Sequence, residues 1–291
     1  MKVIVTGGSG FMGKRIIRRL HEKGHDTMSY DKVDKFDILN RDQLEGVFLM
    51  FHPDAVIHLA ACSDLNIFVK FPDISKRINV QGTRNILELC DTHGVRLLFA
   101  STCCCYGNNN THPSDESSPV CPTEPYAQSK RDSEYDILNS IKERDTKHTC
   151  MRLATFYGPE MRKALAPAIF IDNIQRGEVI EIHGSGDQTR TMTYVDDMIE
   201  GIITILEGDI TFPIVNVTTE EIVSVIDMIS HAEKVVGKKA KVVHVEDRKG
   251  QIHKEAIKST RLQSLGWKAK TTFEVGMKNS YEYYLDNGCK W

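Results

Sequence analysis

The sequence predicts an α/β fold: a doubly wound parallel sheet with helices on both faces, followed by a smaller C-terminal α/β lobe. The first observation is that short apolar runs alternate with longer helical patterns through the N-terminal half. Alternation of this kind gives a parallel sheet covered on both faces. The second observation is that the first apolar run ends in a glycine-rich turn that opens a helix. A chain of 291 residues is long enough for this domain and a further lobe.

The expected elements can be placed in order along the chain. The first strand is expected over 2–6, and the helix after it ends at Gly24, because glycine commonly follows the last helical turn. The polar stretch 108–125 is expected to be a loop that covers the site. The other expected elements are strands over 26–30, 54–59, 96–100 and 149–153 and helices over 42–51, 73–93 and 126–142.

The glycine-rich turn has the spacing Gly7-x-x-Gly10-x-x-Gly13, with Phe11 and Met12 between its last two glycines. Glycine permits a tight turn, close approach of the backbone to a pyrophosphate, and close packing of the helix on the strand. Free N–H groups and the dipole at the start of the helix favour the phosphate. Because a strand precedes the turn and a helix follows it, these five residues are expected to form a Rossmann-type dinucleotide site.

Asp31 ends the second strand, roughly 20 residues after the turn, where a carboxylate accepts hydrogen bonds from the adenosine ribose. A carboxylate at this point repels a 2′-phosphate, so the sequence favours NAD over NADP. The neighbouring Lys32 could weaken that preference. The alternative is that Asp31 only shapes the turn after its strand.

Tyr126 and Lys130 are four residues apart in an expected helix, so both side chains can reach one site. A free phenol has a pKa near ~10 and is a poor base at neutral pH. A nearby cation lowers that pKa, which would make Tyr126 a proton shuttle. Taken alone, the pattern is weak, and a packing tyrosine with a solvated lysine is the more common reason for it.

Charge and composition exclude several classes of function. The chain has 37 basic and 40 acidic residues and a net charge of −3, without a basic stripe, so neither nucleic acid nor an anionic membrane is an expected partner. No apolar run approaches the ~20 residues of a membrane span. The first residues lead directly into a strand and do not resemble a signal peptide.

The eight cysteines show neither the paired spacing of a zinc site nor a disulfide framework. No metal site is therefore expected. Reduced thiols in a cytoplasmic protein are the simplest interpretation.

Further motifs make the chain similar to a known superfamily. Together with the glycine turn and Tyr126-x-x-x-Lys130, they are similar to the extended short-chain dehydrogenase/reductase superfamily. The similarity lies in its NAD-dependent nucleotide-sugar epimerase/dehydratase branch, which includes UDP-glucose 4-epimerase. The motifs occur in family order over nearly the whole chain: His58-Leu59-Ala60-Ala61, Asn79-Val80-Gln81-Gly82-Thr83, Ser101-Thr102, Tyr106-Gly107, Tyr157-Gly158-Pro159, Gly184-x-Gly186, Tyr194-Val195-Asp196-Asp197 and Leu265-Gly266-Trp267.

The resemblance implies roles at the matching positions. Thr102 would contact the reacting sugar hydroxyl and relay a proton between it and Tyr126, because a hydroxyl both donates and accepts. Lys130 would hold the nicotinamide ribose and keep the pKa of Tyr126 low. Asn79 would lie beside the nicotinamide; the alternative is that it only caps or kinks its helix. The remaining implied cofactor contacts are Asp37 and Ile38 at the adenine and Leu59, Ala60 and Ala61 along the cofactor.

The resemblance also implies two parts: an NAD-binding domain over 1–157, to which later segments return, and a mainly substrate-binding lobe over 158–291. Arg190 and Arg248 match arginines that grip the diphosphate of a nucleotide sugar. Each could instead be a solvated surface residue. Thr155 lies near an Asn common in 4-epimerases, and Arg190-Thr191-Met192 departs from the usual Arg-Asp-Tyr/Phe, so the sugar stays open.

Two cysteines bear on the reaction. Family 4,6-dehydratases have an Asp-Glu pair after the catalytic Thr, but this chain has Cys103-Cys104. A thiol is a weak acid, with a pKa near ~8.5, so dehydration is disfavoured. A 4-epimerase needs only Thr102, Tyr126, Lys130 and NAD. The sequence therefore predicts NAD-dependent 4-epimerisation of a UDP-sugar through a transient 4-keto intermediate.

Alternatives stay open. A nucleotide-4-keto-sugar reductase would consume NAD(P)H. A 3,5-epimerase/reductase of the GDP-fucose-synthase type would use Cys104 as a base, but its partner His is absent from 160–172. A non-catalytic NAD(P)-binding regulator usually lacks the Tyr or the Lys. Family habit implies a homodimer formed through paired helices that include the Tyr126 helix.

Overall fold

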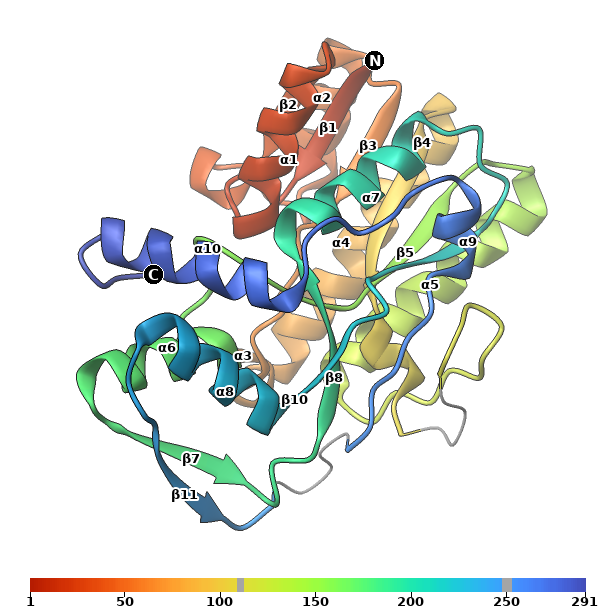
Figure 1. Cartoon of the computed structure of the whole chain (residues 1–291). Coiled ribbons are helices and arrows are strands. Elements are labelled where there is room, and N and C mark those ends of the chain that lie inside the picture. The colour runs from red at the N-terminus through yellow and green to blue at the C-terminus, as the bar shows by residue number, and fades with distance from the viewer. Residues whose placement is uncertain (109–112, 248–252) are drawn as a thin grey trace.

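The computed structural model describes residues 1–108, 113–247 and 253–291 (Figure 1). Its central sheet has the strand order β2-β1-β3-β4-β5-β9, and every neighbouring pair is parallel. This confirms the predicted parallel sheet. The strands are β1 (Lys2–Thr6), β2 (Asp26–Tyr30), β3 (Ala55–His58), β4 (Arg96–Thr102), β5 (Thr149–Leu153) and β9 (Ile214–Val217).

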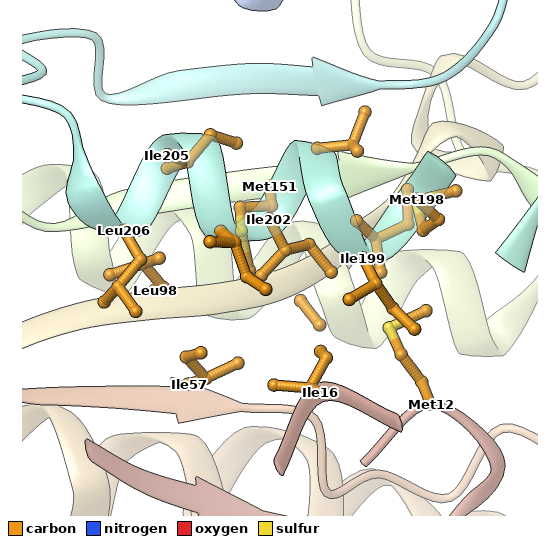
Figure 2. Packing of buried hydrophobic residues seen from close by; sticks show 14 of the residues in the cluster. Met12, Ile16, Ile57, Leu98, Met151, Met198, Ile199, Ile202, Ile205 and Leu206 are labelled. Carbon is orange, nitrogen blue, oxygen red and sulfur yellow. The ribbon is translucent and has the colours of Figure 1, made fainter. Parts of the chain in front are cut away.

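Helices cover both faces of this sheet. Successive side chains of a strand point to opposite faces, so Val3 and Val5 join one core while Ile4 joins the other. Figure 2 shows the first core, where α1 (Phe11–Glu22) and α7 (Val195–Glu207) pack on β3, β4 and β5. The second core lies under α2 (Arg41–Phe51), α4 (Pro72–His93) and α5 (Pro125–Arg144).

A smaller lobe lies beside the sheet and has its own core. Its elements form a three-stranded sheet, a two-stranded parallel ribbon and three helices (Figure 1). The sheet consists of β6 (Thr155–Tyr157), β8 (Thr189–Tyr194) and β10 (Ile222–Ser224). The ribbon consists of β7 (Val179–His183) and β11 (Lys241–Val245). The helices are α6 (Ala166–Arg176), α8 (Val225–Val236) and α10 (Phe273–Asp286).

The second half of the chain also returns to the large sheet. Strand β9 adds its edge next to β5, and α7 covers one face. Leu262 of α9 (Thr260–Ser264) and Trp267 enter the α1–α7 core. No helix in the described ranges is long and apolar enough to cross a membrane.

Short elements differ from the sequence prediction. The helix α3 (Leu65–Lys70) was not expected; Asp64 caps it by accepting hydrogen bonds from the N–H groups of Asn66 and Ile67. Two 3₁₀ turns follow strand ends: η1 (Lys32–Asp34) and η2 (Cys103–Tyr106). The described part of the expected loop, 113–124, docks on a C-terminal segment, since Ser114 bridges to Ile257. A cavity lies beyond the carboxyl ends of the central strands, and none of the described residues of this loop lines it.

Candidate active site

A cavity of about 650 Å³ lies beyond the carboxyl ends of the central strands, a size typical of ligand pockets. Parallel sheets bind ligands at this edge. The cavity brings together most of the residues expected from the sequence. Of those, the ones that line it are Gly7, Gly10, Phe11, Met12, Gly13, Asp31, Ile38, Leu59, Ala60, Ala61, Thr102, Tyr126, Lys130 and Thr155.

The glycine turn requires its glycines. Gly7 has a φ of +71°, a conformation that L side chains rarely adopt. A Cβ at Gly13 would lie 2.2 Å from the carbonyl oxygen of Gly7, so no side chain fits there. Gly10 caps α1 without a side-chain hydrogen bond, which leaves the helix N-terminus available to an anion. These residues fit the diphosphate of a dinucleotide.

Asp31 shapes the turn after its strand, while its contact with the adenosine ribose stays a prediction. Its Oδ1 accepts from the N–H of Val33 at 3.0 Å, which shapes the turn η1. Its Oδ2 accepts from the N–H of Ser9 at 3.1 Å, which ties β2 to the glycine turn, and the residue still lines the cavity. Lys32 also lines the cavity, but its Nζ lies 3.3 Å from Asp37 Oδ2. Asp37 itself is not among the residues that line this cavity.

Asn79 lies behind the cavity wall. Its Oδ1 accepts from the N–H of Cys62 at 2.7 Å, and its Nδ2 donates to the Cys62 carbonyl at 3.0 Å. The same Nδ2 donates to the Ser129 hydroxyl at 3.0 Å. Cys62 lines the cavity, whereas Asn79 is buried and does not. Asn79 therefore connects the cavity wall to the helix that bears Tyr126.

His58 anchors the same wall through hydrogen bonds whose directions can be assigned. The Thr83 hydroxyl donates to the carbonyl of Asn79 at 2.6 Å, so its oxygen accepts from His58 Nε2 at 2.9 Å. His58 Nδ1 must then accept from the Thr6 hydroxyl at 2.7 Å. The Thr6 oxygen in turn accepts from the N–H of Ala60 at 3.2 Å. Burial and the charge of Lys130 lower the pKa of His58 to about 3, so the ring is neutral.

Lys130 is buried beneath the cavity. Its Nζ donates to the carbonyl of Ala100 at 2.7 Å and lies 4.6 Å from the centre of the Phe99 ring. The Tyr126 ring centre is 6.0 Å away. Burial lowers the pKa of Lys130 to about 8, although Cys105 and Glu134 oppose that shift.

The expectation that Lys130 keeps the pKa of Tyr126 low is wrong for this structure. Burial raises the pKa of Tyr126, and the nearby thiols Cys104 and Cys105 add to the rise. The cation that opposes the rise is Arg162. Desolvation of the phenolate is therefore larger than the stabilisation that these cations supply.

Thr102 ends β4 and caps η2. Its Oγ1 accepts from the N–H of Cys104 at 3.2 Å, and Thr102 lines the cavity. Cys104 also lines the cavity. Burial and the charge of Glu255 raise the pKa of its thiol to about 11, so Cys104 stays protonated at neutral pH. A protonated thiol is a poor base.

Sequence reasoning missed two charged residues of the cavity wall, Arg162 and Glu255. Neither belongs to a motif, and both are brought in by segments after residue 157, so no local pattern could have found them. Arg190 does not line the cavity; its Nη1 donates to the carbonyl of Thr189 at 2.8 Å. Arg248 lies outside the described residues. In the described ranges no group of three or more His, Cys, Asp or Glu side chains could hold a metal ion.

The geometry of the site agrees with the family to which the sequence matches. Residues 3–217 match the NAD dependent epimerase/dehydratase family. The chain belongs to this family. The resemblance predicted from the motifs is confirmed, and so are an enzyme of this family and NAD as its cofactor.

Similar proteins catalyse different reactions. The UDP-glucose 4-epimerase of Thermotoga maritima, solved with UDP-glucose, is 28% identical over 99% of both chains, with a TM-score of 0.93. The UDP-glucuronic acid 4-epimerase of Bacillus cereus, solved with UDP-glucuronic acid and NAD, is 25% identical over 99% of this chain and 100% of that one, with a TM-score of 0.91. UDP-glucuronic acid decarboxylase 1 of Xenopus tropicalis is 26% identical over 97% of this chain and 72% of its own length.

Proposed function

We propose that this protein is an NAD-dependent 4-epimerase of a UDP-sugar. The observation that supports this most is the composition of one cavity wall. It holds Thr102, Tyr126 and Lys130 but, in place of an acid and a base after Thr102, it holds Cys103 and Cys104. The first three residues suffice for epimerisation at C4, whereas elimination of water needs a separate acid and base.

The residues of this chain would divide the work as follows. Tyr126 takes the proton of the sugar C4 hydroxyl and later returns it. Thr102 donates its hydroxyl proton to the same oxygen and holds it next to Tyr126. Lys130 supplies a buried positive charge beside the phenol and a donor for a ribose hydroxyl. NAD, held at the glycine turn, would supply the hydride acceptor and donor that interconverts the C4 alcohol and the 4-keto sugar.

The absence of a histidine from 160–172 argues against the 3,5-epimerase/reductase alternative. That reaction needs a base next to the sugar carbon acidified by the 4-keto group. Burial and the charge of Glu255 raise the pKa of the Cys104 thiol to about 11, and 160–172 supplies no histidine to take up its proton. We infer that Cys104 fills space at the end of β4.

The test is to purify the protein and assay it for bound NAD. It is then incubated with UDP-glucose or UDP-N-acetylglucosamine while the configuration at C4 and the cofactor redox state are followed. We expect NAD to copurify and the C4 epimer to form without net oxidation or reduction. Stoichiometric consumption of NAD(P)H with a 4-keto sugar would instead identify a reductase. A stable 4-keto-6-deoxy product or release of CO₂ from UDP-glucuronic acid would identify a dehydratase or a decarboxylase.

A further inference from the structure

Glu255 is a carboxylate built into the wall of the cavity. Only 6% of the residue is exposed, and yet it lines the cavity together with Thr102 and Tyr126. Its segment is fixed on both sides: Lys254 bridges to Thr189 of the small sheet, and Ile257 bridges to the segment at 114. The carboxylate therefore cannot easily leave the cavity.

The polar partners of Glu255 leave part of the carboxylate available. Oε1 accepts from the N–H of Thr191 at 3.3 Å, and within the described ranges this is the hydrogen bond found for the carboxylate. Arg190 stabilises its charge electrostatically, while burial raises its pKa. A buried carboxylate oxygen without a donor is costly unless a ligand supplies one.

Glu255 lies at the end of the cavity where the chemistry is expected. Its charge raises the pKa values of both Cys103 and Cys104, the two residues that directly follow Thr102. It is thus close to the place where the sugar, and not the adenine, would lie. Asp31 and Lys32, the charged residues at the end of β2, belong to the adenosine end.

The cations near this end leave the charge of Glu255 in the cavity wall. Arg190 acts on Glu255 electrostatically but does not itself line the cavity. Lys130 is engaged with the carbonyl of Ala100 beneath the cavity. Arg162 lines the cavity but is exposed, so water screens its charge. A negative group on the sugar would therefore meet a buried like charge at Glu255 and only a solvated cation at Arg162.

We propose that Glu255 sets the substrate class, favouring a nucleotide-linked sugar with a hydroxyl at this position over one with a carboxylate. This rests on the UDP-sugar function proposed above. A sugar hydroxyl can donate to the free oxygen of Glu255, which satisfies both groups. A uronic acid would instead place two buried carboxylates next to each other, and like charges in a desolvated site strongly disfavour binding.

The experiment is calorimetric titration of the NAD-loaded protein with UDP-glucose and with UDP-glucuronic acid. We expect wild type to bind UDP-glucose at least about tenfold more tightly. Glu255→Gln should reduce the ratio of the two affinities at least about fivefold, mainly by tightening the binding of UDP-glucuronic acid. The amide keeps the shape of the side chain and loses its charge. The control is Glu274→Gln on the exposed surface of α10, which should leave the ratio unchanged.

Two further measurements keep the proposal open to refutation if Glu255→Gln does not fold. In wild type, the ratio should narrow as the pH is lowered, because the raised pKa of Glu255 lets the carboxylate take up a proton more readily than an ordinary glutamate. The charged or titratable groups that influence it are Arg190, Cys103 and Cys104. The second measurement is the same titration of the Arg162→Gln variant, which should still bind UDP-glucose more tightly than UDP-glucuronic acid.

The opposite results would overturn the proposal. Equal or tighter binding of UDP-glucuronic acid by wild type, with a ratio that neither Glu255→Gln nor pH changes, excludes a selecting role for Glu255. The two proposals fail separately. If Glu255→Gln changes the ratio of affinities but the protein does not convert the sugar at C4, the selecting role of Glu255 is supported and the proposed epimerase activity is contradicted. If the protein converts the sugar at C4 but the ratio does not change, only the selecting role of Glu255 is contradicted.

Discussion

At the scale of single residues, Tyr126 must ionise in a site that disfavours its charge. Burial and neighbouring thiols raise the pKa of its phenol. In the proposed reaction, Tyr126→Phe keeps the ring and removes the proton carrier, so kcat should fall by about 10²- to 10⁴-fold. NAD should still copurify, because the phenol is not needed for the glycine turn. Steady-state kinetics with UDP-glucose measure the first effect, and the cofactor content of the purified variant measures the second. A kcat above about a tenth of the wild-type value would show that Tyr126 is not the proton carrier.

His58 gives a pH-dependent prediction whose sign follows from its lowered pKa. In the unfolded chain a histidine has a pKa near ~6.5, but in the folded protein it is about 3. The folded state therefore binds the proton less well, so stability from this group is complete above about pH 6.5 and is lost as the pH falls toward 3. Each pH unit in this window costs up to about 1.4 kcal/mol.

Urea unfolding of wild type and His58→Gln at several pH values measures this effect. Since Gln does not titrate, the variant should be less stable than wild type at pH 7 but should lose less stability on acidification. Other groups titrate in both proteins, so the difference between the two curves reports His58. Parallel curves would show that His58 is not neutral and buried in the folded protein.

At the scale of elements, the long alternating strands and helices were predictable and the short ones were not. The 22 residues of α4 bury one face in the core and were expected within one residue of their observed start. The six residues of α3 have too few turns to show a helical period, and only the cap at Asp64 marks their start. The 3₁₀ turn η2 depends on Thr102 as its cap and on packing of the cysteines. Such turns are set by tertiary contacts.

The glycine turn gives a prediction with a matched control on another helix. Gly13→Ala places a methyl group 2.2 Å from the Gly7 carbonyl oxygen, so the backbone of the turn must move. We expect the purified variant to have lost most of its bound NAD. Gly46→Ala, on α2, meets no atom within 4 Å and should raise stability by about 0.5–1 kcal/mol with NAD retained. Absorbance of the denatured protein extracts and thermal unfolding compare the two; retained NAD in Gly13→Ala would show that the turn does not hold the cofactor.

At the scale of the whole molecule, the site combines segments that are far apart in the sequence. The residues expected from local patterns, such as Gly7 and Tyr126, come from strand ends and helix starts of the large sheet. Arg162 and Glu255 reach the same cavity only because the chain leaves the sheet and returns. For Asp37, the motif position did not reveal that Lys32 engages its carboxylate, and the adenine contact stays a prediction. Sequence patterns place residues along elements, but tertiary packing decides which charges share a cavity.

Arg15 joins the two parts of the molecule at the cofactor end of the site. It lies on α1, and its guanidinium donates to the carbonyl of Pro159 at 2.9 Å and to Asp196 Oδ1 at 3.1 Å. It also lies 5.7 Å from the centre of the Phe11 ring, which stacks on Phe156 of β6. Since Phe11 and Phe156 both line the cavity, Arg15 supports the wall where the two parts meet.

Arg15→Met keeps the length of the side chain and removes its donors, which leaves the carbonyl of Pro159 without this bond. We expect a loss of about 1–3 kcal/mol in unfolding free energy, because the bond joins a charged donor to a partly buried carbonyl. The KM for the proposed UDP-sugar should rise while kcat changes less, because the substrate contacts expected of the small lobe would shift relative to Tyr126. Arg18→Met, an exposed position on the same helix, is the control and should change neither quantity. A lowered kcat at unchanged KM would mean that Arg15 acts on the glycine turn and not on the junction between the two parts.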